Sequence, residues 1–257
     1  MNKHPIIALL TDFGTADHYV ASMKAVILSI APNSVIIDLS HDVPPQDVDA
    51  AAYLLWSAHA WFPAGTIFVC VVDPGVGTRR PIICLRTKYT FIAPDNGLLK
   101  YVLPASGRPR IIAVTNRTYA LKTISRTFHG RDIFAPAAAH LASGVSHEQL
   151  GKRVTPLHAP ERFVLVSGTT SSGKVLHVDR FGNIITNLLC RNLPNNAVLK
   201  IGRARIHRAF RTYGEAGGSQ PFMTIGSSGL LEISIRNGSA ARTLKAHSGD
   251  PVLLARS

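Results

Sequence analysis

The segment Val71–Arg80, VVDPGVGTRR, carries two side chains that could do chemistry together. Asp73 follows an apolar run that begins at Ile67, so we expect it where a buried strand ends and a Pro/Gly loop begins, a common ligand-binding position. The loop then delivers Arg80. A carboxylate and a guanidinium at the two ends of such a turn could hold a small polar reactant between opposite charges. The same spacing fits a structural ion pair that closes the loop, so other segments must decide between these interpretations.

Two more carboxylates follow the first apolar run of the chain. Asp12 comes at the carboxyl end of an expected strand, where a carboxylate can accept hydrogen bonds from two vicinal hydroxyls, as in a ribose. Asp17 comes at the start of an expected helix, where capping and the helix dipole explain an acidic residue as well as a ligand does. We therefore expect Asp12 to contact a ligand and leave both roles of Asp17 open.

One histidine stands out among the eleven. His129 lies in FHGRDIFAP, in a glycine turn between an aromatic residue and an Arg–Asp pair, directly before a helix expected from Asp132. An imidazole there titrates near neutrality and can act as a base or as a hydrogen-bond donor. His41, in SHDVPPQDVDAA, is expected to be a hydrogen-bonded loop residue and not a catalyst.

The second half of the chain offers groups suited to binding a nucleoside and an amino acid. Asp179, Phe181 and Asn183 follow one another closely in HVDRFGNIITNLL, and an aromatic face beside an amide is what purine recognition needs. Taken alone, this segment is also explained by a β-bulge with Asn183 capping a turn. Ser227 and Ser228, in GSSGLLEISI, offer hydroxyls and backbone amides suited to a carboxylate.

Several common sites are excluded by spacing. Gly75 and Gly77 do not form a dinucleotide-binding fingerprint, because Arg80 stands where the third glycine should be, and there is no Walker loop. No metal-ligand cluster is apparent, so the sequence predicts no metal and no cofactor. The cysteines lie in apolar runs without CxxC spacing and are expected to be core residues: Cys70, Cys84 and Cys190.

Composition fits a globular protein with a substantial core, at 257 residues, 46% hydrophobic and 17% charged. Apolar stretches are too short to span a bilayer and no signal-peptide pattern is seen, so the sequence predicts a cytoplasmic protein without a membrane partner.

The net charge of +13 raises the question whether the protein binds nucleic acid. Specific binding is not expected, because no aromatic residues are interleaved with the basic ones. The spacing of the main basic group instead suggests one face of an exposed strand: Arg203, Arg205, Arg208 and Arg211.

The fold class expected is α/β with an additional all-β domain. Residues 1–151 alternate β-branched runs with amphipathic segments, which predicts a mostly parallel sheet flanked by helices. Residues 152–173 are expected to be a linker, and residues 174–257 a small barrel-like β domain. The expected strands are 6–10, 35–39, 66–72, 82–86, 90–93, 111–114, 174–179, 184–189, 198–201, 206–210, 222–225, 230–235 and 251–254. The expected helices are 17–30, 47–61 and 132–142.

Taken together, seven segments in order along the chain resemble the S-adenosyl-L-methionine (SAM) hydroxide adenosyltransferases, or SAM hydrolases, relatives of the fluorinating and chlorinating SAM enzymes. These segments are TDFGTADHYVASMK, DLSHDVPPQD, VVDPGVGTRR, APDNGLL, FHGRDIFAP, DRFGNIITN and GSSGLLEI. The resemblance implies hydrolysis of SAM to adenosine and L-methionine, with no cofactor. It also implies a homotrimer in which each active site lies between the N-terminal domain of one subunit and the C-terminal domain of its neighbour.

The resemblance also implies roles for individual residues. Asp73, Arg80 and His129 match the residues that place the attacking water, and Asp12 matches the ribose-binding carboxylate. Positions around the methionine portion are matched by Asp17, Asp179, Ser227 and Ser228. Positions around the adenine are matched by Phe181, Asn183 and Tyr213, whereas Arg236 stands where a small or amide residue is expected.

Two alternative functions remain at this stage. A SAM halogenase would form 5′-halo-5′-deoxyadenosine, but the halogenating relatives do not have an acid at the position of Asp73 or a histidine at that of His129. A SAM-binding or nucleoside-binding regulator would use the same pocket with little turnover.

Overall fold

The structure is a computed structural model that describes residues 4–106, 109–192 and 196–256. The chain divides into two compact units, Met1–Glu161 and Arg162–Ser257. This division falls inside the segment 152–173 that we expected to be a linker. The first unit is an α/β domain and the second a barrel-like β domain, so the expected fold class is confirmed.

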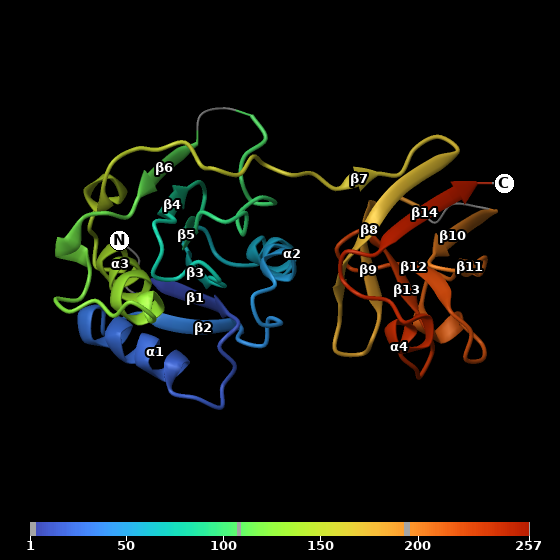
Figure 1. Ribbon diagram of the computed structural model, residues 1–257, viewed down its shortest axis with the longest axis horizontal. Coiled ribbons are helices and arrows are strands. Elements are labelled where there is room, and N and C mark those ends of the chain that lie inside the picture. Colours follow the sequence, from blue (N-terminus) through green and yellow to red (C-terminus); the bar gives the residue numbers. More distant parts are fainter. Residues whose placement is uncertain (1–3, 107–108, 193–195, 257) are drawn as a thin grey trace. The chain divides into compact units, whose positions relative to one another are not determined.

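The first unit is built on a six-stranded sheet with the order β2-β1-β3-β5-β4-β6 (Figure 1). β1 pairs in parallel with β2 and β3, and β3 with β5, whereas β4 is antiparallel to β5 and β6. All six strands lie where the sequence predicted them. Their bounds are β1 (Ile6–Thr11), β2 (Val35–Ser40), β3 (Ile67–Val71), β4 (Ile82–Arg86), β5 (Thr90–Pro94) and β6 (Arg110–Ala113).

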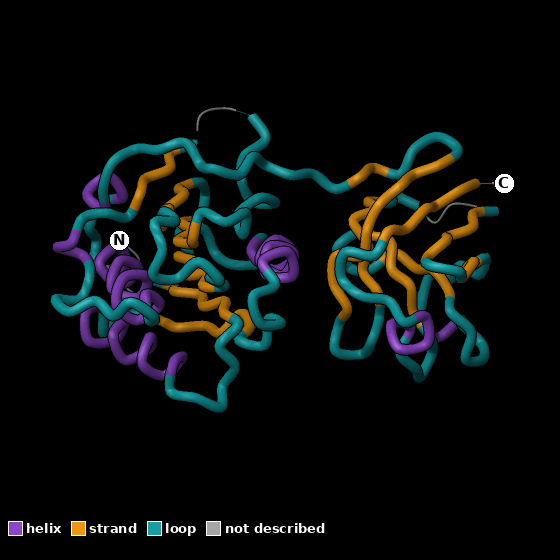
Figure 2. Tube along the Cα trace, in the orientation of Figure 1, coloured by secondary structure: helices purple, strands orange, loops and turns teal. Residues whose placement is uncertain are grey.

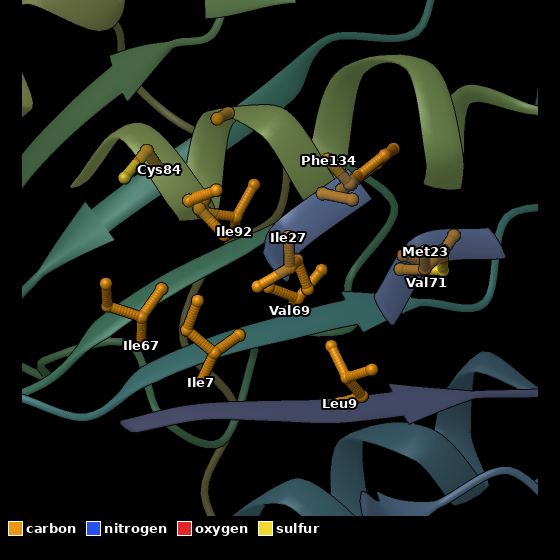
Figure 3. Close-up of a cluster of buried hydrophobic side chains, with 14 of the residues drawn as sticks. Ile7, Leu9, Met23, Ile27, Ile67, Val69, Val71, Cys84, Ile92 and Phe134 are labelled. Carbon is orange, nitrogen blue, oxygen red and sulfur yellow. The ribbon is translucent and has the colours of Figure 1, made fainter. Parts of the chain in front are cut away.

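Helices cover both faces of this sheet. α1 (Tyr19–Ile30) and α3 (Ala135–Ala142) share a hydrophobic core with one face, and α2 (Val48–His59) shares a second core with the other. Odd-numbered residues of β1 and β3 point into the first core, as the alternation of a strand requires. Figure 3 shows Ile7, Leu9 and Val71 there with Met23 and Phe134. Because β1 and β3 pair in parallel, their carboxyl ends lie side by side at one edge of the sheet.

The three helices appear where expected, but α3 is preceded by a π-helical turn, η2 (Gly130–Phe134). The predicted helix from Asp132 thus begins as a wider turn. Short 3₁₀ turns complete the unit, η1 (Arg117–Tyr119) and η3 (His147–Leu150). The three cysteines are buried, which confirms their expected place in the core.

The second unit is a sheet with the order β11-β10-β14-β8-β9-β13-β12, in which β7 pairs with β9. Figure 2 shows that strands make up most of its regular structure. An isolated bridge from Ala209 to Met223 on β12 brings the two ends of the sheet together, so the sheet is nearly closed around one core. The strands are β7 (Val164–Leu165), β8 (Thr170–Val178), β9 (Ile184–Leu189), β10 (Ala197–Ile201), β11 (Ala204–Ile206), β12 (Phe222–Ile225), β13 (Leu230–Ser234) and β14 (Pro251–Arg256). Also present are η4 (Tyr213–Glu215) and α4 (Ala240–Leu244).

One expected strand is wrong. Residues 206–210 were predicted as a strand, but β11 ends at Ile206 and the following residues are irregular apart from the bridge at Ala209. The four arginines consequently do not form one face of a strand. Arg205 lies in β11, whereas Arg208 turns back and donates to the carbonyl of Gly217 at 2.8 Å. A sequence period of two to three cannot distinguish a strand from a hairpin followed by a loop.

Candidate active site

Asp73, Arg80 and His129 come together in the first unit. The Arg80 Nε atom donates to both carboxylate oxygens of Asp73, at 2.8 and 2.9 Å, and Nη2 makes a further short contact with Oδ2. The same Nη2 lies 3.1 Å from His129 Nδ1. The Asp73 side chain is only 5% exposed and that of Arg80 12%. The ion pair between Asp73 and Arg80, predicted as one of two alternatives, is therefore present. Its arginine also contacts His129.

The loop after β3 explains how two residues seven positions apart meet. Val76 N donates to Asp73 O, and Thr78 N to Gly75 O, so two consecutive turns return the chain toward its start. Gly77 has φ +79°, and a Cβ there would lie 2.5 Å from the carbonyl oxygen of Arg126. Glycine is needed both for this backbone conformation and for the close approach of the second segment.

His129 is positioned by the π-helical turn that precedes α3. The N–H of Ala135 donates to the carbonyl of Gly130, five residues earlier, which makes this turn wider than an α-helical one. Because an arginine can only donate, Nδ1 of His129 must be the acceptor in the contact with Arg80. The neutral imidazole then carries its proton on Nε2.

Burial and the neighbouring charge favour the neutral form of this histidine. Desolvation is the largest cause that lowers the pKa of His129 below its ordinary value of 6.5, and the positive charge of Arg80 is the next. Asp73 and Asp132 act in the opposite direction without reversing the shift. A neutral His129 at pH 7 is what the contact with Arg80 requires.

A pocket of about 380 Å³ opens beside this cluster. It is lined by Asp73 and His129 together with Asp12, whose Oδ2 accepts a hydrogen bond from the Gln46 backbone at 2.8 Å. Asp12 and Asp73 each follow a strand, as the sequence predicted, and the structure shows that these strands, β1 and β3, are neighbours in the sheet. Aromatic rings form a further part of the lining, and the sequence reasoning missed them: Phe13, Tyr19 and Phe128. Their rings lie 5.0 to 6.0 Å apart in edge and tilted contacts.

A buried histidine supports this edge of the sheet. His41 Nδ1 lies 2.8 Å from Thr11 Oγ1 at the end of β1, and its backbone oxygen accepts from Gly14 N. Its other ring nitrogen lies 3.0 Å from Asp38 Oδ1. His41 is thus a hydrogen-bonded loop residue, as predicted, and it ties the turn that follows Asp12 to the next loop.

Asp17 is not brought into this group. It is exposed, it is not among the described residues that line the pocket, and α1 begins two residues later. The N-cap of α1 is His18, so Asp17 does not cap this helix, which removes one of the two roles left open for it. Its ligand role stays a prediction.

A second pocket, of about 820 Å³, lies in the second unit. Asp179, Phe181, Asn183 and Tyr213 all line it, as does Arg236. The Asp179 carboxylate accepts from the backbone N–H groups of Phe181 and Asn183 at 2.9 and 2.8 Å, and from the Asn183 amide at 2.9 Å. These bonds hold a tight loop from which the Phe181 ring projects, 77% exposed.

Ser227 and Ser228 lie in the turn between β12 and β13, outside the described lining of this pocket. The turn is closed by a hydrogen bond from Gly229 N to Gly226 O at 2.9 Å. Arg236, the departure from the family pattern, donates to the carbonyl of Ala216 at 3.3 Å. The predicted residues thus form one group in each unit, except for three that lie outside both groups: Asp17, Ser227 and Ser228.

The described residues contain no group of three or more His, Cys, Asp or Glu side chains arranged to hold a metal ion. In the same residues, no helix has the length and apolar character needed to cross a bilayer.

Comparison with known proteins identifies the relatives of this chain. Residues 7–151 match the N-terminal domain of SAM hydroxide adenosyltransferases, and residues 173–253 match their C-terminal domain. A protein of Thermus thermophilus named (R)-S-adenosyl-L-methionine hydrolase is 41% identical, over 96% of this chain and 98% of that protein. A fluorinase of an Actinoplanes species is 32% identical over 73% of this chain and 72% of its own length. The crystal structure of an uncharacterized conserved protein from Thermotoga maritima superimposes with a TM-score of 0.88 and 37% identity, covering 97% of this chain and all of that one. The chain belongs to the SAM hydroxide adenosyltransferase family.

Proposed function

We propose that this protein hydrolyses SAM to adenosine and L-methionine by attack of water on C5′ of the ribose. The observation that carries the proposal is the Asp73–Arg80–His129 cluster beside a pocket that also contains Asp12. The relatives named as hydrolases, 41% and 36% identical over nearly the whole chain, support it. The fluorinases are more distant, at 28 to 32% identity.

The chemistry demands help for the nucleophile and not for the leaving group. As the new C5′–O bond forms, the C5′–S bond breaks and its electron pair leaves the sulfonium as a neutral thioether. The water loses one proton. Full ionisation of water at pH 7 costs about 12 kcal/mol, from its pKa of about 15.7. Proton removal must therefore accompany attack, for which general-base help contributes roughly a hundred- to ten-thousand-fold.

The cluster divides this work between donors and an acceptor. With Nδ1 of His129 occupied by Arg80, the Nε2–H group is the donor that orients the water oxygen. The Asp73 carboxylate supplies acceptor oxygens with lone pairs beyond those that Arg80 uses. Asp73 is thus the group of the three best placed to take the proton.

The remaining residues are proposed to bind the substrate. Asp12 binds the ribose diol, and Phe181, Asn183 and Tyr213 bind the adenine. Asp17, Asp179, Ser227 and Ser228 surround the methionine portion. From the resemblance to the family, we propose a homotrimer with active sites at subunit interfaces and no cofactor. No nucleic-acid partner is proposed, because the basic residues are not interleaved with aromatic ones. The cytoplasmic location stays a prediction from the sequence.

Product identification in isotopically labelled water tests the reaction. With SAM in H₂¹⁸O, the 5′-hydroxyl of the adenosine released should carry the label, because water is the nucleophile. Mass spectrometry of adenosine and methionine measures this directly. The same incubation in chloride or fluoride buffer provides the contrast. A 5′-halo-5′-deoxyadenosine as the main product would refute hydrolysis in favour of halogenation.

The pH dependence should reveal His129. Its pKa is lowered from the ordinary value of 6.5, so the imidazole is mainly neutral at pH 7 and gains a proton in more acidic solution than a free imidazole does. Protonation at Nδ1 breaks the contact with Arg80, so kcat/KM should fall as the pH is lowered, with the midpoint of this fall below pH 6.5. A steady-state profile of kcat/KM on both sides of pH 6.5 measures this midpoint. A midpoint above pH 6.5 would contradict a neutral, desolvated His129.

A further inference from the structure

A buried carboxylate in the second unit has no part in the site so far. Glu232 lies in the middle of β13, opposite Thr224 of β12 and Ile185 of β9, and is only 6% exposed. Its neighbours Leu231 and Ile233 point into the core of the barrel. Because side chains alternate along a strand, Glu232 points to the opposite face, which is nevertheless covered.

The Glu232 carboxylate is held by two hydroxyl groups. Its Oε1 atom accepts from Tyr213 Oη at 2.6 Å and from Ser234 Oγ at 2.8 Å, and Ser234 is fully buried. A buried carboxylate without partners would be strongly destabilising, and hydrogen bonds to a charged acceptor are about twice as strong as neutral ones. The hydrogen bond from Tyr213 to Glu232 is therefore expected to stabilise the position of both side chains.

Tyr213 connects this carboxylate to the second pocket. It lies in η4, within a loop that contains Gly214, Gly217 and Gly218, and its side chain is half exposed where it lines the pocket. Burial, and then the bond to Glu232, raise the pKa of Tyr213, so its hydroxyl keeps the proton that it donates. One edge of the ring is thus fixed to the barrel while the rest faces the pocket.

The other oxygen of Glu232 lies against the serine turn. A Cβ on Gly226 would come within 2.7 Å of Oε2, so the carboxylate occupies the space that a side chain at this position would need. Gly226 begins the turn that carries Ser227 and Ser228. The Glu232 side chain therefore contacts both Tyr213 and the turn that carries the two serines, which are predicted to bind different parts of the substrate.

We infer that Glu232 is a positioning residue for the substrate, which fixes Tyr213 against the purine and supports the turn that carries Ser227 and Ser228. It acts through these neighbours and does not contact the reacting atoms. This inference rests on the proposed function, because the pocket is taken to hold the adenosine portion of SAM.

Tyr213→Phe removes the hydrogen bond to Glu232 at its half-exposed partner, so the variant should fold normally. Losing one hydrogen bond to a charged group should raise KM for SAM about tenfold, with kcat within about twofold. Glu232→Gln keeps an acceptor oxygen and should raise KM less than Glu232→Ala does. Since the two residues share one bond, the effects of Tyr213→Phe and Glu232→Gln on KM should be less than additive in the double variant.

The matched control is Tyr101→Phe, which removes another tyrosine–glutamate bond, from Tyr101 Oη to Glu161 Oε1 at 3.4 Å, in the first unit. Tyr101 is not among the residues that line either pocket, so the Tyr101→Phe variant should have an unchanged KM. Independent effects of the Tyr213 and Glu232 variants, or an unchanged KM in Tyr213→Phe, would overturn the inference.

Calorimetry with adenosine separates this inference from the proposed reaction. Wild-type protein that binds adenosine without hydrolysing SAM would refute the reaction alone, and the inference then requires a weaker Kd in Tyr213→Phe. Wild-type protein that turns SAM over while its variants bind adenosine as tightly as it does would refute the inference alone. Failure of the wild-type protein both to hydrolyse SAM and to bind adenosine would refute both.

Discussion

His129→Ala should reduce the release of adenosine from SAM by roughly a hundredfold or more, because it removes the donor that orients the attacking water. Asp73→Asn should do the same, because the amide keeps the shape of the carboxylate but cannot take a proton. Neither change removes a proposed contact to the ribose, adenine or methionine. Binding of SAM should therefore stay within roughly tenfold. Single-turnover product analysis measures the chemical step, and calorimetry measures the Kd.

His140→Ala is the matched control for His129. His140 also lies in the first unit with a pKa lowered by burial, but it belongs to α3, packs against Tyr119 of η1 and is not part of the described pocket lining. Its replacement should leave turnover nearly intact. Equal losses of binding and turnover in the His129 and Asp73 variants would instead indicate a ligand-binding regulator. Unchanged turnover would reduce the cluster to a structural ion pair.

Phe134→Ala should lower the free energy of unfolding of the first unit by about 3 to 5 kcal/mol, as expected for removing a fully buried aromatic ring. Phe134 fills the core between the sheet and α1 (Figure 3). The guanidinium carbon of Arg80 lies 5.8 Å from the centre of its ring, so the cavity would form directly beneath the cluster. Turnover should fall as well, because Arg80 loses the surface against which it is held.

Tryptophan fluorescence during urea unfolding measures this effect. Trp56 and Trp61 are the two tryptophans of the chain, and both lie in the first unit. Phe134→Leu, which keeps most of the volume, should lose clearly less stability and less turnover than Phe134→Ala. Equal stability losses in the two variants would show that the ring itself contributes little.

The first unit was predictable because local signals agreed there. Short β-branched runs alternate with amphipathic helices, and Pro or Gly marks their ends, so strands and helices were placed within a few residues. The second unit was less predictable. Residues 206–210 look like a strand by composition, but the chain leaves the sheet after Ile206. Pairing partners, and not local preference, decide such short strands.

The site shows the same division between local and distant information. Asp12 and Asp73 could each be placed at the end of a strand, whereas the pairing of β1 with β3, which brings them together, came from the structure. The link between Arg80 and His129, far apart in sequence, was given only by the resemblance to a family. Glu232 gave no local signal, since a glutamate between Leu231 and Ile233 resembles an ordinary outward-facing strand residue. Its partner Tyr213 belongs to a loop whose course the sequence does not specify.

The π-helical turn at Gly130–Phe134 limits how this protein can vary in length. A π turn holds one residue more than an α-helical turn, so deleting one residue from it would tighten it to ordinary α-helical bonding. α3 could keep its packing against α1, yet the wider turn that places His129 beside Arg80 would be lost. Insertions and deletions in this turn should therefore be harmful even where the helix that follows survives them.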